Sequence, residues 1–83
     1  MGFFFRENAL KQFKKLSQEA QQRIVKKLVF FSQQDDPLDF AEHLNDSMLG
    51  HYRFRVGDYR IIVDIEDNGL KILAVGHRKD IYR

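Results

Sequence analysis

The chain contains no cysteine and a single proline, and its three histidines are scattered. The lack of cysteine excludes a disulfide scaffold, a thiol nucleophile and the soft ligands of structural zinc. No apolar run approaches the roughly 18 residues that a membrane-spanning helix requires, and Phe3-Phe4-Phe5 is too short for the core of a secretory signal. We therefore expect a cytoplasmic protein with no membrane partner, no metal and no other cofactor.

The length of the chain indicates one domain. A chain of 83 residues buries only about 60% of its unfolded surface on folding, which is too little for two separate cores. Hydrophobic residues make up 43% of the chain and charged residues 31%, a balance typical of globular domains. We expect a single domain over residues 1–83.

The net charge is only +2, but the charge is polarised along the sequence. Residues 1–34 carry seven Lys or Arg and two acids, residues 35–49 carry five acids and no Lys or Arg, and residues 50–83 carry seven Lys or Arg and five acids. A basic surface beside an acidic segment can serve a polyanion on one side and a cationic partner on the other. A solvated helix surface followed by an acidic loop explains the helical charges equally well.

The first half of the chain predicts a short strand followed by two helices. Phe3–Arg6 is brief and aromatic, which suits a strand. From Glu7 the apolar residues recur at helical spacing, and Ser17 offers an N-cap for a second helix that should end before Pro37. The two helices should form a hairpin. Their apolar faces consist of Ala9, Phe13 and Leu16, and of Ala20, Ile24, Leu28 and Phe31.

The second half of the chain changes to the alternation of β-strands. Residues 38–44 allow one more helical turn before this change. The expected fold class is α+β, with a three-stranded antiparallel meander in one sheet that packs on the helical hairpin. The expected strands are His51–Val56, Tyr59–Ile65 and Leu70–Val75, joined by turns at Gly57-Asp58 and at Asp67-Asn68-Gly69.

Cations and aromatic residues interleave in two segments, His51–Arg60 and Gly76–Tyr82. Alternation places Tyr52, Phe54 and Val56 toward the core and His51, Arg53 and Arg55 on the opposite face. Arg60 joins that outward face if the turn before it keeps the register. Grouped cations with aromatic neighbours are typical of RNA-binding surfaces. Taken singly, each of these residues also has a structural explanation, as a solvated charge or a packing residue.

The order of the elements and three sequence segments resemble the RelE/ParE toxins of bacterial and archaeal toxin–antitoxin systems. The segments are Tyr52-Arg53-Phe54-Arg55, Tyr59-Arg60 and Gly76-His77-Arg78-Lys79-Asp80-Ile81-Tyr82. The resemblance spans nearly the whole chain and implies a RelE-like microbial RNase fold. Members of the RelE branch are ribosome-dependent endoribonucleases that cut mRNA in the A site, and members of the ParE branch inhibit DNA gyrase. The implied partners are a cognate antitoxin, mRNA and the ribosomal A site with its rRNA.

Metal-free RNA cleavage needs a group that orients the attacking 2′-hydroxyl, cations that stabilise the phosphorane and an acid that protonates the 5′-oxygen. By resemblance, Arg60 and Arg78 match the two phosphate-binding arginines of the family, and Tyr82 matches the terminal tyrosine of the RelE branch. Arginine suits phosphate because its planar fork binds two oxygens and stays charged. Further candidates for binding RNA phosphate are Arg53, Arg55, His51 and Lys79.

The proton-transfer groups depart from the family pattern. Arg53 and Arg55 stand where characterised RelE proteins usually carry lysines. Because a guanidinium is effectively never deprotonated, these residues can bind phosphate but cannot act as a general base. His77, directly before Arg78, is our first replacement candidate because imidazole exchanges protons near neutral pH. His51 is the second candidate.

Three functions fit this sequence. The favoured function is a toxin that is a metal-independent mRNA endonuclease and inhibits translation. A gyrase inhibitor of the ParE type is less favoured because Arg60, Arg78 and Tyr82 are all retained. A catalytically weakened RNA-binding remnant is the third, because arginine replaces the family's lysines at positions 53 and 55.

Overall fold

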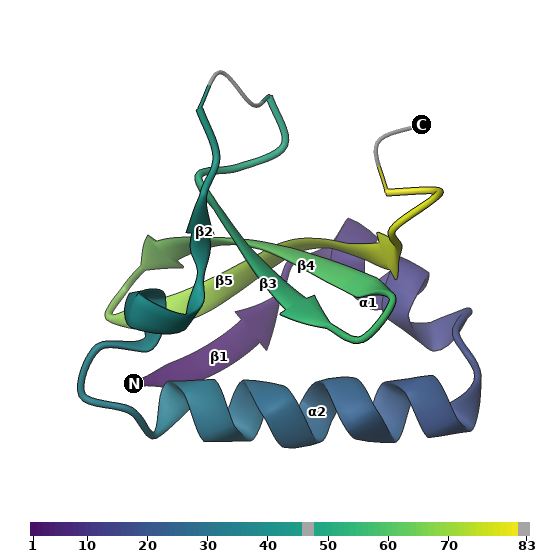
Figure 1. The fold of residues 1–83 in the computed structure, drawn as a ribbon, viewed down its shortest axis with the longest axis horizontal. Coiled ribbons are helices and arrows are strands. Elements are labelled where there is room, and N and C mark those ends of the chain that lie inside the picture. Colours follow the sequence, from purple (N-terminus) through teal and green to yellow (C-terminus); the bar gives the residue numbers. More distant parts are fainter. Residues whose placement is uncertain (46–47, 82–83) are drawn as a thin grey trace.

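A computed structural model describes residues 1–45 and 48–81 and contains one five-stranded sheet with helices on one side (Figure 1). The strand order is β1-β5-β4-β3-β2; β1 runs parallel to β5, and the other neighbours are antiparallel. This arrangement confirms the expected α+β class and the meander. The elements are β1 (Gly2–Phe5), α1 (Glu7–Lys14), α2 (Gln18–Ser32), the 3-10 helix η1 (Pro37–Phe40), β2 (Glu42–His43), β3 (Tyr52–Val56), β4 (Tyr59–Glu66) and β5 (Gly69–His77).

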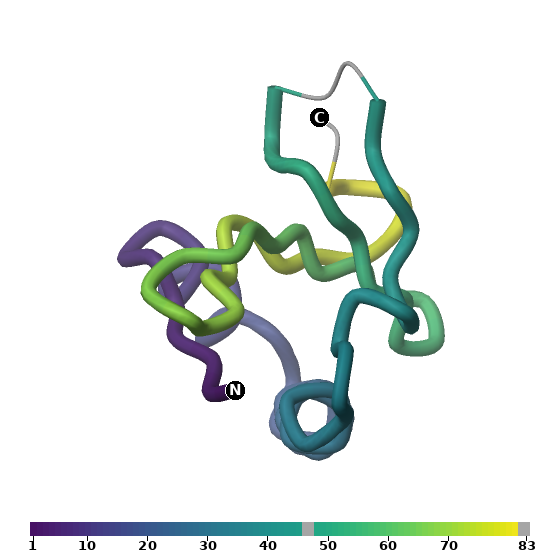
Figure 2. Tube along the Cα trace, turned by 90° about the vertical axis from the view of Figure 1, so that its left-hand side faces the viewer, coloured from purple at the N-terminus to yellow at the C-terminus, as the bar shows by residue number. Residues whose placement is uncertain are grey.

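The two helices form where the periodicity predicts them. Ser17 caps α2, because its Oγ accepts a hydrogen bond of 3.1 Å from the backbone N–H of Ala20. Figure 2 looks along α2 and shows the sheet to one side of it. No helix within residues 1–45 and 48–81 is long and apolar enough to span a membrane.

The main core lies between the helices and the inner face of the sheet. Phe31 of α2 and Phe54 of β3 stack with their ring centroids 4.3 Å apart and their planes at 9°. Burying such aromatic rings contributes most of the stability of a small core. The other buried core residues are Ala9, Ile24, Leu28, Val56, Ile61, Val63, Leu70, Ile72 and Val75.

Residues 38–44 form two elements rather than the one helical turn that we expected. Asp36 caps η1 by accepting a hydrogen bond from the N–H of Leu38, and η1 ends at Phe40. The chain then becomes extended, and Glu42–His43 pairs with β3 as a fifth strand. A strand of two residues has no alternation to read, so the sequence pattern could not reveal it.

Two tight turns set the register of the meander. Gly57 has φ = +59°, a conformation that favours glycine, and it begins the two-residue turn between β3 and β4. Asp67 and Asn68 have φ values of +53° and +59° and form the turn between β4 and β5. Both turns lie at the predicted places, but Gly69 is the first residue of β5. That strand also extends two residues beyond its predicted end at Val75.

The outer face of the sheet carries a second, smaller apolar cluster. Its buried members are Ile62, Leu73 and Ala74, and the partly buried Leu44 and Ile81 pack against them. The backbone of Gly50 packs closely against this cluster. A Cβ atom at position 50 would lie 2.7 Å from Ile62 Cγ2 and 2.7 Å from Leu73 Cδ1, which is closer than real Cβ contacts. The chain before β3 is therefore held against the outer face.

We predict that Gly50→Ala lowers the free energy of unfolding by about 1–3 kcal/mol, because the added methyl group overpacks the outer cluster. Urea denaturation measures the change. Gly2→Ala is the matched control, since a Cβ there meets nothing within 4 Å, and its effect should stay within about 0.5 kcal/mol. Equal stabilities of the two variants would contradict the close packing at Gly50.

Candidate active site

Three arginines lie on the outer face of the sheet, as alternation predicted. In the register between β3 and β4, Arg55 lies opposite Arg60, and Arg53 lies opposite Ile62 of the outer apolar cluster. Residues directly opposite each other in an antiparallel pair project from the same face. The sheet therefore gathers the cations on the face that the helices do not cover.

Arg60 is almost buried, with 9% of its surface exposed. Its Nη1 donates hydrogen bonds of 2.9 Å to the carbonyl oxygens of Gly57 and Tyr59. These bonds fold the guanidinium back over the turn between β3 and β4 and fix its orientation. Within the described part of the chain, its Nε and Nη2 donate to no other residue, so they can bind an anion on the outer face.

Arg78 follows β5 and lies beside the same turn. Its backbone N–H donates a 2.7 Å hydrogen bond to the carbonyl of Asp58, and its Nε lies 3.7 Å from Asp58 Oδ1. Its side chain is 57% exposed, so this ion pair holds it only weakly. The turn between β3 and β4 therefore contacts both Arg60, near the start of β4, and Arg78, just after the end of β5.

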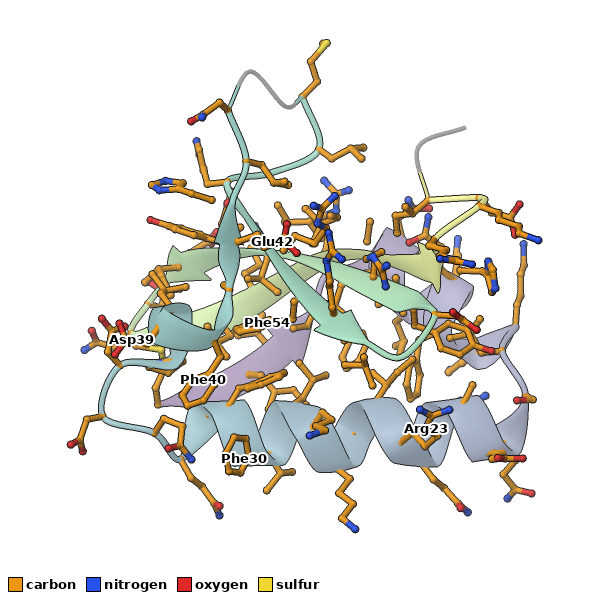
Figure 3. All side chains as sticks on the ribbon, viewed as in Figure 1. Arg23, Phe30, Asp39, Phe40, Glu42 and Phe54 are labelled. Atoms are coloured by element: carbon orange, nitrogen blue, oxygen red, sulfur yellow. The ribbon has the colours of Figure 1, made fainter. Side chains whose placement is uncertain are left out.

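Glu42 is a member of the site that sequence reasoning missed. Its carboxylate accepts a hydrogen bond of 2.6 Å from Arg53 Nη2 and another from Arg55 Nε. Figure 3 shows Glu42 on the side of the sheet away from α2. The hydrogen bonds from Arg53, and secondly from Arg55, hold the pKa of Glu42 below its ordinary value of 4.5, so it is ionised at neutral pH. Only its place in the two-residue strand β2 reveals this role.

His77 lies on the other face of the sheet. It pairs with Tyr59, which packs against the main core, and the two ring centroids are 5.9 Å apart. Its Nδ1 accepts a 3.1 Å hydrogen bond from the N–H of Lys79, whose side chain is exposed. The structure therefore does not bring His77 together with the outer-face arginines. Tyr82, the remaining predicted catalytic residue, lies outside the described residues.

His51 lies on the outer face, one position before β3. Both its backbone N–H and its ring Nδ1 contact Oδ1 of Asp64, at 2.7 Å and 2.8 Å. The imidazole is 73% exposed and the Asp64 side chain 27% exposed. Of the two histidines that the sequence proposed for proton transfer, His51 is the one on the arginine face.

A separate groove of about 550 Å³ lies between α2 and the turn that follows β3. Four cations line it around the exposed ring of Phe30, and the Lys27 Nζ lies 5.7 Å from the centre of that ring. Figure 3 shows Arg23 and Phe30 projecting from α2. The groove combines positive charge with an apolar aromatic surface. Its lining residues are Arg23, Lys26, Lys27, Phe30, Arg55, Val56 and Gly57.

Solved structures of toxins share this fold. The toxin–antitoxin complex RelBE2 from Mycobacterium tuberculosis has a TM-score of 0.77 and 26% identity over 93% of this chain and 96% of that chain. The isolated RelE toxin from E. coli has a TM-score of 0.72 and 22% identity over 92% and 82%. The RelB–RelE antitoxin–toxin complex from Methanococcus jannaschii has a TM-score of 0.67 and 24% identity over 95% and 94%. No curated protein matches the chain.

The sequence itself matches a family model. The model describes the "ParE toxin of type II toxin-antitoxin system, parDE", and it matches residues 3–82. This match covers nearly all of the chain and agrees with the fold of the RelE toxins. The chain therefore belongs to the ParE toxin family, and it is a type II toxin–antitoxin toxin of the RelE/ParE superfamily.

Proposed function

We propose that this toxin is a ribosome-dependent endoribonuclease that cleaves mRNA in the A site without a metal ion. One observation carries the proposal: the outer sheet face holds Arg53, Arg55 and Arg60 beside an ionised carboxylate, and Arg78 lies at its end. A surface that only inhibits another protein has no need for this combination of phosphate-binding groups and a proton acceptor. The attacking group is the 2′-hydroxyl of the RNA, which displaces the 5′-oxygen of the next nucleotide.

The arginines stabilise the charge that develops on the phosphate. Attack by the 2′-oxygen adds negative charge to the equatorial oxygens of the phosphorane, and fixed guanidinium donors stabilise that charge without reorganising. Arg60 is the best oriented of them, because two turn carbonyls hold its Nη1 and the residue is almost buried. Arg78, which is more exposed, can close onto the phosphate from the end of the sheet.

Glu42 supplies the general base that neither Arg53 nor Arg55 can provide. In the free protein both arginines hydrogen-bond to its carboxylate and lower its pKa. When an RNA phosphate takes over those guanidinium donors, Glu42 loses the bonds that lower its pKa and becomes a stronger base. The same step that seats the substrate therefore prepares the carboxylate to accept the proton of the 2′-hydroxyl.

The A site contributes the alignment of the RNA. A sheet face with few proton-transfer groups can stabilise charge, but it cannot by itself hold a flexible phosphodiester in line for attack. Holding the reacting groups in an aligned geometry is worth several powers of ten in rate. Free RNA should therefore be cut poorly compared with mRNA on a ribosome.

We predict that Arg60→Ala and Arg78→Ala each reduce A-site cleavage at least about 10²-fold, as loss of an oxyanion donor does. Purified variants are added to ribosomes paused on a defined message, and primer extension maps the new 5′ ends. Lys14→Ala, at an exposed position of α1, is the control and should cleave normally. Urea midpoints verify the folding of each variant, and losses below threefold for both arginines would remove their assigned roles.

We predict that Glu42→Gln reduces cleavage by about 10²-fold or more, because an amide cannot accept the proton. Glu66→Gln is the matched control, since Glu66 also forms an ion pair across the sheet, with Lys71 at 2.8 Å. In the free protein, the hydrogen bonds from Arg53 and Arg55 hold the pKa of Glu42 below its ordinary value, so the carboxylate stays ionised when the medium is mildly acidic. Since the pH dependence of kcat/KM reports the free protein, the wild-type kcat/KM should show no loss from protonation of Glu42 as the pH falls from 8 to about 6. Full activity of Glu42→Gln would contradict its role as the base.

Inhibition of DNA gyrase is the second candidate function, and the match to the ParE family model favours it. In that case a protein-binding surface carries the function and the outer-face arginines are dispensable. A gyrase supercoiling assay with the wild-type toxin separates the two candidates. Inhibition of supercoiling together with intact A-site messages would replace the proposed activity, and no effect in either assay would indicate an inactive RNA-binding remnant.

An antitoxin is the expected protein partner, since the similar solved structures include toxin–antitoxin complexes. The groove beside α2, with its cations around Phe30, fits an acidic amphipathic segment of such a partner.

We predict that Lys27→Glu weakens binding of the cognate antitoxin at least about tenfold, because it reverses a charge that would face acidic side chains of the bound partner. Calorimetry measures the affinity, with Lys14→Glu as the control; equal affinities for the two variants would exclude the groove.

A further inference from the structure

Residues 78–81, which follow β5, fold back over the sheet on the side away from α2 (Figure 1). They form a tight turn, because the backbone N–H groups of Asp80 and Ile81 donate hydrogen bonds of 2.8 Å and 3.0 Å to the carbonyl of His77. Ile81 is the only apolar residue among these four, and it packs against the buried residues of the outer cluster. Ile81 is thus the apolar contact by which the turn rests on the sheet.

Gly76 provides the space that Ile81 occupies. A Cβ atom at position 76 would lie 3.4 Å from Ile81 Cδ1 and 3.7 Å from Ile81 Cβ, so the Ile81 side chain lies directly over the glycine. Gly76 is also paired with Arg60 in the register between β4 and β5, and paired residues project from the same face of a sheet. Ile81 therefore fills the position beside Arg60 where a side chain of β5 would otherwise lie.

Arg78 depends on this turn for its place beside Arg60. Its backbone N–H bonds to the carbonyl of Asp58, but its side chain is 57% exposed and its Nε lies 3.7 Å from the Asp58 carboxylate. An exposed ion pair of this kind holds a long side chain weakly, and a short segment with few buried apolar contacts opens locally at low cost. Because Ile81 anchors the far end of the turn, it limits this opening.

We propose that Ile81 is a positioning residue of the candidate active site, which keeps Arg78 beside Arg60 so that both guanidinium groups reach one phosphate. This inference rests on the proposed ribonuclease function. The side chain of Ile81 has no polar atom, so it can neither bind phosphate nor move a proton and acts only through the arginines. Since a displacement of about 1 Å can cost about 10²-fold in rate, the loss of this packing should slow cleavage.

The test asks whether Ile81 acts through Arg78. Single-turnover cleavage is measured on ribosomes paused on a defined message, for Ile81→Ala in the wild-type protein and in the Arg78→Ala variant. Ile81→Ala should slow cleavage by about tenfold or more in the wild-type protein. In Arg78→Ala the further loss should stay below about threefold, because residues that act as a unit are not additive. A residue that only stabilises the fold would cause the same loss in both proteins.

Ile65→Ala is the matched control for the deletion of an isoleucine side chain. Ile65 is 41% exposed and lies near the end of β4, whereas Arg60 lies near its start. This variant should cleave at the wild-type rate. Urea midpoints verify that each variant is folded.

Gly76 allows the same packing to be changed from the other side. Gly76→Ala should cleave within about threefold of the wild-type rate, because its methyl group would meet Ile81 at ordinary contact distances. Gly76→Val should reproduce the loss seen in Ile81→Ala, because its additional methyl groups need the space that Ile81 fills. If Ile81→Ala does not fold, Gly76→Val takes its place, with and without Arg78→Ala.

Amide hydrogen exchange of Arg78 supplies a readout that does not depend on cleavage. In Ile81→Ala this N–H should exchange at least about tenfold faster relative to the amides of β3, because the turn opens more often. Normal cleavage by Ile81→Ala, an equal loss with and without Arg78, or unchanged exchange at Arg78 would overturn the positioning role and leave the ribonuclease function standing. A wild-type protein that cuts no message would overturn both proposals.

Discussion

The two-residue turn at Gly57-Asp58 is the constraint on which the outer face depends. It fixes the register that sets Arg55 opposite Arg60, and its carbonyl groups hold the Arg60 guanidinium and the backbone of Arg78. Because side chains alternate along a strand, a slip of one residue would send Arg60 into the core and Ile61 out to solvent. The positive φ of Gly57 therefore secures both the fold and the placement of the cations.

Gathering arginines on one face has an electrostatic cost, and the carboxylates on that face offset it. Like charges directly opposite each other in a sheet repel, and Arg55 lies directly opposite Arg60. Glu42 contacts both Arg53 and Arg55, and the edge strand that carries it is only two residues long. The charges of Arg53 and Arg55 are thus balanced by a carboxylate on a short edge strand.

Sequence patterns predicted most of the elements and the face on which the candidate arginines lie. The helices, the Ser17 cap and the face that Arg53, Arg55 and Arg60 share all follow from periodicity, which is a local property. Glu42 was missed because its contacts depend on a strand too short to have a period. The sequence also did not reveal the pairing of His51 with Asp64, thirteen residues apart. It depends on the close approach of the chain at Gly50, which is a tertiary effect.

Arg55 belongs to two surfaces at once, since it contacts Glu42 on the outer face and also lines the groove beside α2. One guanidinium cannot serve two bound anions equally well at the same time. Occupation of either surface must therefore weaken the other, and thermodynamic linkage requires that the two affinities fall by the same factor. A partner in the groove would act as a reversible, concentration-dependent antagonist of the proposed RNA binding while contacting only Arg55 of the three outer-face arginines.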